Sequence, residues 1–74
     1  MTVILHYMRY HTHGSMRCED VKDAVGSAWA MVEDNTAWPS HVTDEEGMVL
    51  LDNEALGKRI YALDQWFDKQ ERNT

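Results

Sequence analysis

The segment Thr2-Val-Ile-Leu-His-Tyr-Met-Arg-Tyr-His11 decides how this chain is interpreted. Most of its residues are β-branched, aromatic or long apolar types that favour strands, and it contains neither glycine nor proline. Because side chains alternate along a strand, its two faces carry Val3, Leu5, Tyr7 and Arg9, and Ile4, His6, Met8 and Tyr10. Both faces are largely apolar. This predicts a strand that is covered on both sides, or one that offers its second face to a partner.

The length of 74 residues predicts a single domain with a thin core, because a chain of this size buries only about 60% of its unfolded surface. Cys18 is the only cysteine, so an intrachain disulfide cannot reinforce that core. We therefore expect one α+β domain over residues 1–74, with a frayed tail at 71–74, that gains stability as a homodimer.

The charge balance limits the classes of partner. Thirteen acidic residues against seven basic ones give a formal charge of −6, and nucleic-acid binding needs a basic face. We therefore expect no direct binding of nucleic acid. The chain has no apolar run of the length that spans a membrane and no signal-peptide pattern, so we expect a cytoplasmic protein without a membrane partner.

Residues 11–17 are predicted to form a loop, because Gly14 and Ser15 interrupt the strand pattern. A helix is expected to begin near Cys18, with Ser15 or Cys18 as its N-cap, and to end at residues 33–35 before Pro39. Its apolar stripe, at helical spacing, comprises Val21, Ala24, Val25, Ala28 and Val32.

Residues 38–43 and 48–51 are predicted to form a hairpin around the acidic loop Asp44-Glu-Glu-Gly47, with Thr43 opposite Met48 and Val42 opposite Val49. Asp52 is the expected cap of a last helix. The apolar stripe of that helix comprises Leu56, Ile60, Leu63 and Phe67.

The element order is therefore β-α-β-β-α, which predicts a three-stranded sheet with two helices on one face. The other face of the sheet would stay open, and a soluble monomer rarely exposes a large apolar patch. Each tryptophan either fills the thin core or, where exposed, anchors a partner. We predict partner contacts at Ile4, His6, Met8, Tyr10, Trp29 and Trp38.

Four potential metal ligands, His6, His11, His13 and Cys18, fall close together in the chain. Imidazole and thiolate bind zinc or nickel well, but the spacing matches no standard zinc signature. We expect no bound metal and no cofactor, and a histidine and cysteine metal-binding module is retained as an alternative function.

No motif indicates catalysis. Cys18 lacks the signature of a catalytic cysteine, and no pattern pairs two carboxylates in an apolar pocket. Asp44, Glu45 and Glu46 form too short a loop for a calcium site. We therefore expect a protein that is not an enzyme and that binds another protein. A second alternative is an acidic mimic of nucleic acid, which would present these three carboxylates and those of the helices in place of phosphates.

The chain resembles small acidic proteins of bacteriophages that infect actinobacteria. The resemblance rests on the short aromatic first strand, on Cys18-Glu-Asp-Val-Lys-Asp-Ala24 and on Trp38-Pro-Ser-His-Val-Thr-Asp-Glu-Glu-Gly-Met-Val-Leu-Leu51. It covers most of the chain and transfers no functional residue. It implies an accessory role in the host cytoplasm, as a modulator or inhibitor of a host protein.

Overall fold

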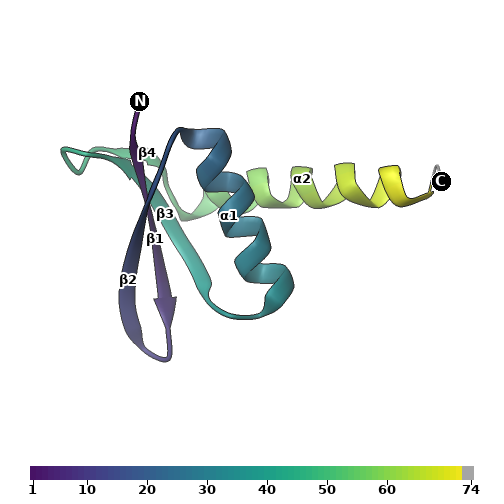
Figure 1. Cartoon of the computed structure of the whole chain (residues 1–74), viewed down its shortest axis with the longest axis horizontal. Coiled ribbons are helices and arrows are strands. Elements are labelled where there is room, and N and C mark those ends of the chain that lie inside the picture. The colour runs from purple at the N-terminus through teal and green to yellow at the C-terminus, as the bar shows by residue number, and fades with distance from the viewer. Residues whose placement is uncertain (73–74) are drawn as a thin grey trace.

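The computed structural model describes residues 1–72 of the chain. The elements in chain order are β1 (Val3–Arg9), β2 (Thr12–Cys18), α1 (Val21–Asp34), β3 (Trp38–Asp44), β4 (Val49–Leu51) and α2 (Asn53–Arg72). The strands form one antiparallel sheet in the order β2-β1-β3-β4 (Figure 1). The predicted α+β class is confirmed, but the prediction of three strands is wrong because the sheet has four.

The additional strand is β2, which replaces the predicted loop at 11–17. Residues Tyr10 and His11 form a two-residue turn with φ of 50° and 65°, the left-handed values that a tight hairpin turn needs. β2 then pairs with β1 without a register shift. Gly14 lies opposite Tyr7, and a Cβ atom on Gly14 would lie 2.6 Å from atoms of the Tyr7 ring. Glycine therefore leaves room inside this strand for the end of the Tyr7 ring, which lies over its backbone.

The core lies between the sheet and both helices. Val3, Leu5 and Val42 are fully buried on one face of the sheet, where β1 and β3 place them side by side. They share one apolar cluster with residues of both helices, so α1 and α2 cover the same face. Figure 1 shows the sheet beside the two helices, with the C-terminal half of α2 extending past α1. The buried cluster comprises Val3, Leu5, Cys18, Ala24, Val25, Ala28, Val42, Leu51 and Leu56.

α1 begins later than predicted. Its N-cap is Asp20, whose side chain accepts a hydrogen bond of 2.8 Å from the Asp23 backbone. The expected caps Ser15 and Cys18 both lie in β2, so that prediction is wrong. The predicted end is confirmed: Asn35 caps the helix in the left-handed conformation, and its N–H contacts the carbonyls of the last turn.

The predicted hairpin of β3 and β4 is present, with a different register. Val42 pairs with Leu51 and Thr43 with Val49, so the expected pairing of Val42 with Val49 is wrong. The carboxylate of Asp44 explains the shift, since it accepts hydrogen bonds from two backbone N–H groups of the loop, at Glu46 and Met48. These bonds keep the loop compact and leave a register shift between Val42 and Thr43.

α2 begins as predicted. The side chain of Asp52 accepts a hydrogen bond of 2.8 Å from the Ala55 backbone, so Asp52 is the N-cap. The predicted stripe is buried at Leu56 and becomes progressively more exposed towards Phe67. α2 continues through Arg72, and the rest of the tail expected to fray, residues 73–74, lies outside the described residues.

Candidate functional site

The helix-free face of the sheet has three rows of side chains across β2, β1 and β3. Each row is centred on one residue of β1, namely Ile4, His6 or Met8. The sheet register places Arg17 and Thr43 beside Ile4, Ser15 and His41 beside His6, and His13 and Trp38 beside Met8. α1 and α2 pack on the opposite face, with Val3, Leu5 and Val42, so neither helix, as described within residues 1–72, covers this second face of the first strand.

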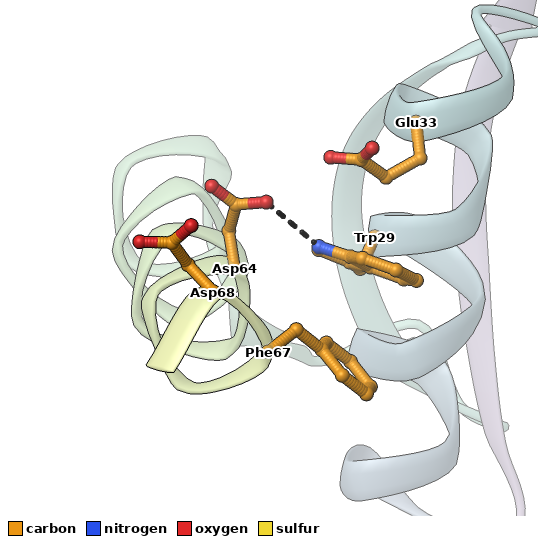
Figure 2. Close-up of a pocket in the computed structure, with 5 residues that line it drawn as sticks. All are labelled: Trp29, Glu33, Asp64, Phe67 and Asp68. Atoms are coloured by element: carbon orange, nitrogen blue, oxygen red, sulfur yellow. Dashed lines mark hydrogen bonds between the residues drawn. The ribbon is translucent and has the colours of Figure 1, made fainter. Parts of the chain in front are cut away.

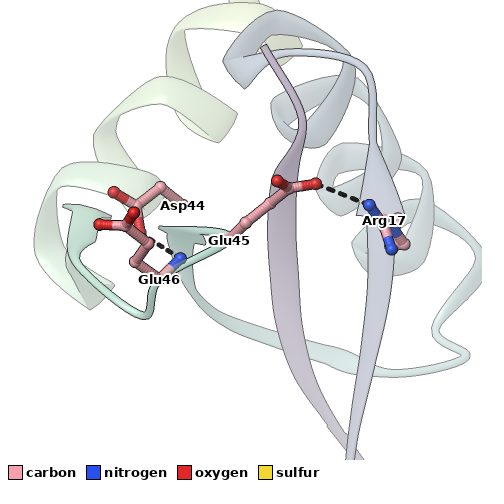
Figure 3. A network of polar contacts seen from close by, with 4 residues as sticks. All are labelled: Arg17, Asp44, Glu45 and Glu46. Atoms are coloured by element: carbon pink, nitrogen blue, oxygen red, sulfur yellow. Dashed lines mark hydrogen bonds and ion pairs between the residues drawn. The ribbon is translucent and has the colours of Figure 1, made fainter.

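The row at Ile4 includes Arg17, which forms an ion pair with the acidic loop. Arg17 of β2 and Glu45 of the acidic loop lie 2.6 Å apart between Nη2 and Oε1, and their side chains meet across β1 (Figure 3). Both side chains are largely exposed, so the pair adds little stability. Ile4 lies between Arg17 and Thr43 in the sheet and is half-buried. Glu45 is held by this pair, and the carboxylate of Asp44 accepts hydrogen bonds from the backbone of its own loop.

The middle row is a histidine cluster. The rings of His6 and His41 stack with centroids 4.3 Å apart and an interplanar angle of 2°. His6 Nδ1 lies 3.3 Å from His13 Nε2, and His6 Nε2 lies 2.8 Å from the hydroxyl of the buried Thr43. Burial lowers the pKa of His6 below its usual 6.5, and the neighbouring charges of His41 and His13 lower it further. The surroundings therefore favour the neutral form of the His6 ring more than water does.

The last row ends in an exposed apolar and aromatic surface. Trp38 is 66% exposed and lies opposite Met8, which is 37% exposed. The adjoining turn carries Tyr10, which is 90% exposed although its backbone adopts a left-handed conformation that is unfavourable for tyrosine. Arg9 lies beside it, and its Nε donates to the carbonyl of Thr36. We call Met8, Tyr10 and Trp38 the hairpin-end surface.

The four potential metal ligands are separated by the fold. His6 and His13 approach each other on the helix-free face, but Cys18 lies opposite Val3 on the face covered by the helices. Burial raises the pKa of the Cys18 thiol, so it is a poor thiolate ligand. His11 is exposed in the turn. Among the side chains that the structure describes, up to residue 69, no three from His, Cys, Asp or Glu are arranged to hold a metal ion.

Trp29 has an internal role between the helices. Its Nε1 donates to Asp64 at 3.3 Å, and its ring centroid lies 4.5 Å from that of Phe67. Together with Glu33 and Asp68 these residues line a small hollow of about 220 Å³ (Figure 2). The half-buried indole of Trp29 is thus one of the contacts that join α2 to α1. On the other side of Trp29 the helices diverge around an apolar groove that includes the exposed Trp66.

The charge of the molecule is divided between two parts of the fold. Residues 1–18, which contain β1 and β2, include Arg9, Arg17 and three of the four histidines but no aspartate or glutamate. Residues 19–74 contain all 13 acidic residues and only five basic ones. Met8 and Tyr10 of the hairpin-end surface therefore belong to the cationic part of an acidic protein, and Trp38 of β3 lies opposite Met8. This asymmetry is visible in the sequence, and it identifies Arg9 and Arg17 as site residues that strand patterning did not single out.

No family model, curated protein or solved structure matches the chain. None of the helices in the described part of the chain combines the length and the apolar character needed to cross a membrane.

Proposed function

We propose that this chain is a protein-binding module without enzymatic activity, and that the hairpin-end surface is its contact site. The observation that carries the proposal is the 66% exposure of Trp38 next to Met8 and the strained, exposed Tyr10. Tryptophan, tyrosine, methionine and arginine are the residue types enriched in protein interfaces, and tryptophan, tyrosine and arginine dominate their binding energy. Exposed apolar side chains grouped at one end of a sheet favour aggregation, so they are expected where they form a binding site.

The expected partner is an acidic protein surface with an apolar recess. Arg9 and the histidines His11 and His13 adjoin the hairpin-end surface, and no carboxylate occurs in residues 1–18. Complementary charge increases the rate of association and selects the orientation, while the aromatic side chains supply the affinity. In the bacteriophage setting that the sequence resembles, the partner is a host protein whose activity this chain modulates.

A comparison of variants tests the proposal. Trp38→Ala and Tyr10→Asn remove aromatic rings from the surface, and Tyr61→Ala is the matched control because Tyr61 is also 66% exposed but lies on α2. Each tagged protein is incubated with an extract of the source cells, and the retained proteins are quantified by mass spectrometry.

We expect an acidic protein that is retained by the wild type and by Tyr61→Ala, depleted at least about tenfold with Trp38→Ala and Tyr10→Asn, and released by added salt. If the retained proteins are the same for all four chains, the hairpin-end surface is not the contact site. A partner lost only with Tyr61→Ala would assign binding to α2 instead.

A further inference from the structure

β2 is an uncovered edge strand. It occupies one end of the strand order, and its seven residues pair with β1 in an unbroken register. The opposite edge of the sheet, β4, has only three residues. The strand order places β1 between β2 and β3, so β2 has a neighbouring strand on one side within this chain. A long and regular edge of this kind is a template on which a further strand can pair.

The turn geometry determines which backbone groups of β2 face outward. In a two-residue hairpin turn the N–H of Thr12 bonds to the carbonyl of Arg9, so these two residues form a hydrogen-bonded pair. Bonded and non-bonded pairs alternate along an antiparallel ladder. The N–H and C=O groups of His13, Ser15 and Arg17 therefore point away from β1. They are spaced at every second residue, as a pairing strand requires.

The usual protection of an edge strand is missing from β2. It contains no proline, no lysine and no bulge. Its one full charge, Arg17, is already paired with Glu45 of the same chain. Met16 is 37% exposed on the helix side of the sheet, at the margin that α1 leaves uncovered.

We infer that β2 pairs antiparallel with β2 of a second copy of this chain, with Ser15 opposite Ser15 on the two-fold axis. This register is self-complementary. It places the long side chain of Met16 opposite the partner's Gly14, the position without a side chain, where the sulfur meets the end of the partner's Tyr7 ring. It also places Arg17 opposite the partner's His13, so the two arginines do not face each other.

The inferred pairing joins two sheets into one continuous sheet of eight strands and uses all three outward-facing residues of each β2. It lies along the strand edge and leaves Trp38 exposed. It is therefore independent of the proposed function, and either can fail without the other.

Sedimentation equilibrium of the wild type and two variants tests the inference. Ser15→Pro removes an outward N–H and no bond to β1, and Met16→Glu places a charge against the partner. Met48→Glu is the matched control, because Met48 is exposed in the loop between β3 and β4. We expect a wild-type dimer, unchanged by Met48→Glu and weakened about tenfold or more by each β2 variant, since two hydrogen bonds are lost on the axis with Ser15→Pro.

Cysteine cross-linking tests the register. Cα atoms of a hydrogen-bonded antiparallel pair lie about 5.5 Å apart, within the range of a disulfide. Ser15→Cys should oxidise to a covalent dimer at protein concentrations where Met48→Cys does not, while the buried Cys18 stays reduced in both. A wild type that remains monomeric at high concentration overturns the inference. So does a dimer that survives Met16→Glu or that Ser15→Cys does not trap.

Discussion

Replacing Tyr10-His11 with Asn-Gly should stabilise the domain. Both residues have positive φ, 50° at Tyr10 and 65° at His11, in the two-residue turn between β1 and β2. Asparagine tolerates this conformation and glycine adopts it without strain, which is why Asn-Gly is the preferred pair in such turns.

The size of the gain follows from the backbone. A left-handed conformation costs a non-glycine residue roughly 1–2 kcal/mol, and the double variant removes most of that cost at two positions. The greater freedom of glycine in the unfolded chain returns about 0.5–1 kcal/mol. The expected net gain is about 1–2 kcal/mol, which raises the Tm of a domain of this size by roughly 5–15 °C.

Thermal and urea unfolding, followed by circular dichroism, measure the gain. Tyr61→Asn is the control, because Tyr61 is an exposed tyrosine in a helix and its loss relieves no turn strain. The same double variant removes the Tyr10 ring and should lose the partner that the wild type binds, so stability and binding should change in opposite directions. An unchanged or lower Tm would refute the assignment of strain to this turn.

Three further outcomes follow from the packing. Gly14→Ala should lower the free energy of unfolding by about 1–3 kcal/mol, because its Cβ would lie 2.6 Å from the Tyr7 ring. In a double-mutant cycle, the same substitution should cost less when Tyr7→Ala has removed the ring. Losses that simply add would contradict the contact. Burial and the neighbouring histidines lower the pKa of His6 below 6.5, so the unfolded chain binds a proton there at a higher pH than the folded chain does. The free energy of unfolding should therefore fall as the pH drops below 6.5. In urea titrations His6→Gln should flatten this pH dependence, and an identical slope would show that His6 is not its source. Leu56→Ala truncates a side chain that is 1% exposed and should lower the free energy of unfolding by about 2–5 kcal/mol, enough to unfold much of so small a domain. A loss below about 1 kcal/mol would show that packing of α2 against the core is dispensable.

The elements that periodicity describes well could be predicted from the sequence. Both helices carry apolar residues at helical spacing, and Asp52 marks the start of α2 with a side chain that caps it. Pro39 lies in β3 near its start, where a missing N–H is tolerated. In each case the local preference of the residue agrees with its place in the fold, so sequence reasoning and structure give the same answer.

β2 could not be predicted because its signals are tertiary. Gly14 and Ser15 indicate a loop by their own preferences, and only the Tyr7 ring across the strand explains why glycine is needed. The turn itself lacks the Asn-Gly pair that usually marks a hairpin, since Tyr10 and His11 occupy its left-handed positions. Because residues 11–17 are predicted to form a loop, the predicted start of the first helix falls too early in the chain. Its N-cap is Asp20.

The partner contacts stay a prediction, but the exposure of the side chains that it names can be compared. Met8, Tyr10 and Trp38 were proposed as partner contacts and all three are exposed, whereas Trp29 makes its contacts within the fold, between the helices. The sequence does not assign Met16 to either face of the sheet, because residues 11–17 are predicted to form a loop and not a strand. Its position opposite Leu5 becomes meaningful only once the register of the two strands is known.

The two apolar faces of β1 are covered in different ways, and this difference bears on the proposed contact site. The helices cover Val3 and Leu5 on one face. On the other face, Arg17 of β2 and Glu45 of the acidic loop form an ion pair across β1, and the rings of His13 and His41 lie beside His6. Neighbouring strands therefore supply a polar cover where no helix is present. That cover stops before Met8, since the last row has only an aromatic side chain on its β3 side. On this face of the sheet, a partner at the proposed contact site would bury apolar side chains at the hairpin end, and substitutions at Ile4 should affect folding before they affect binding.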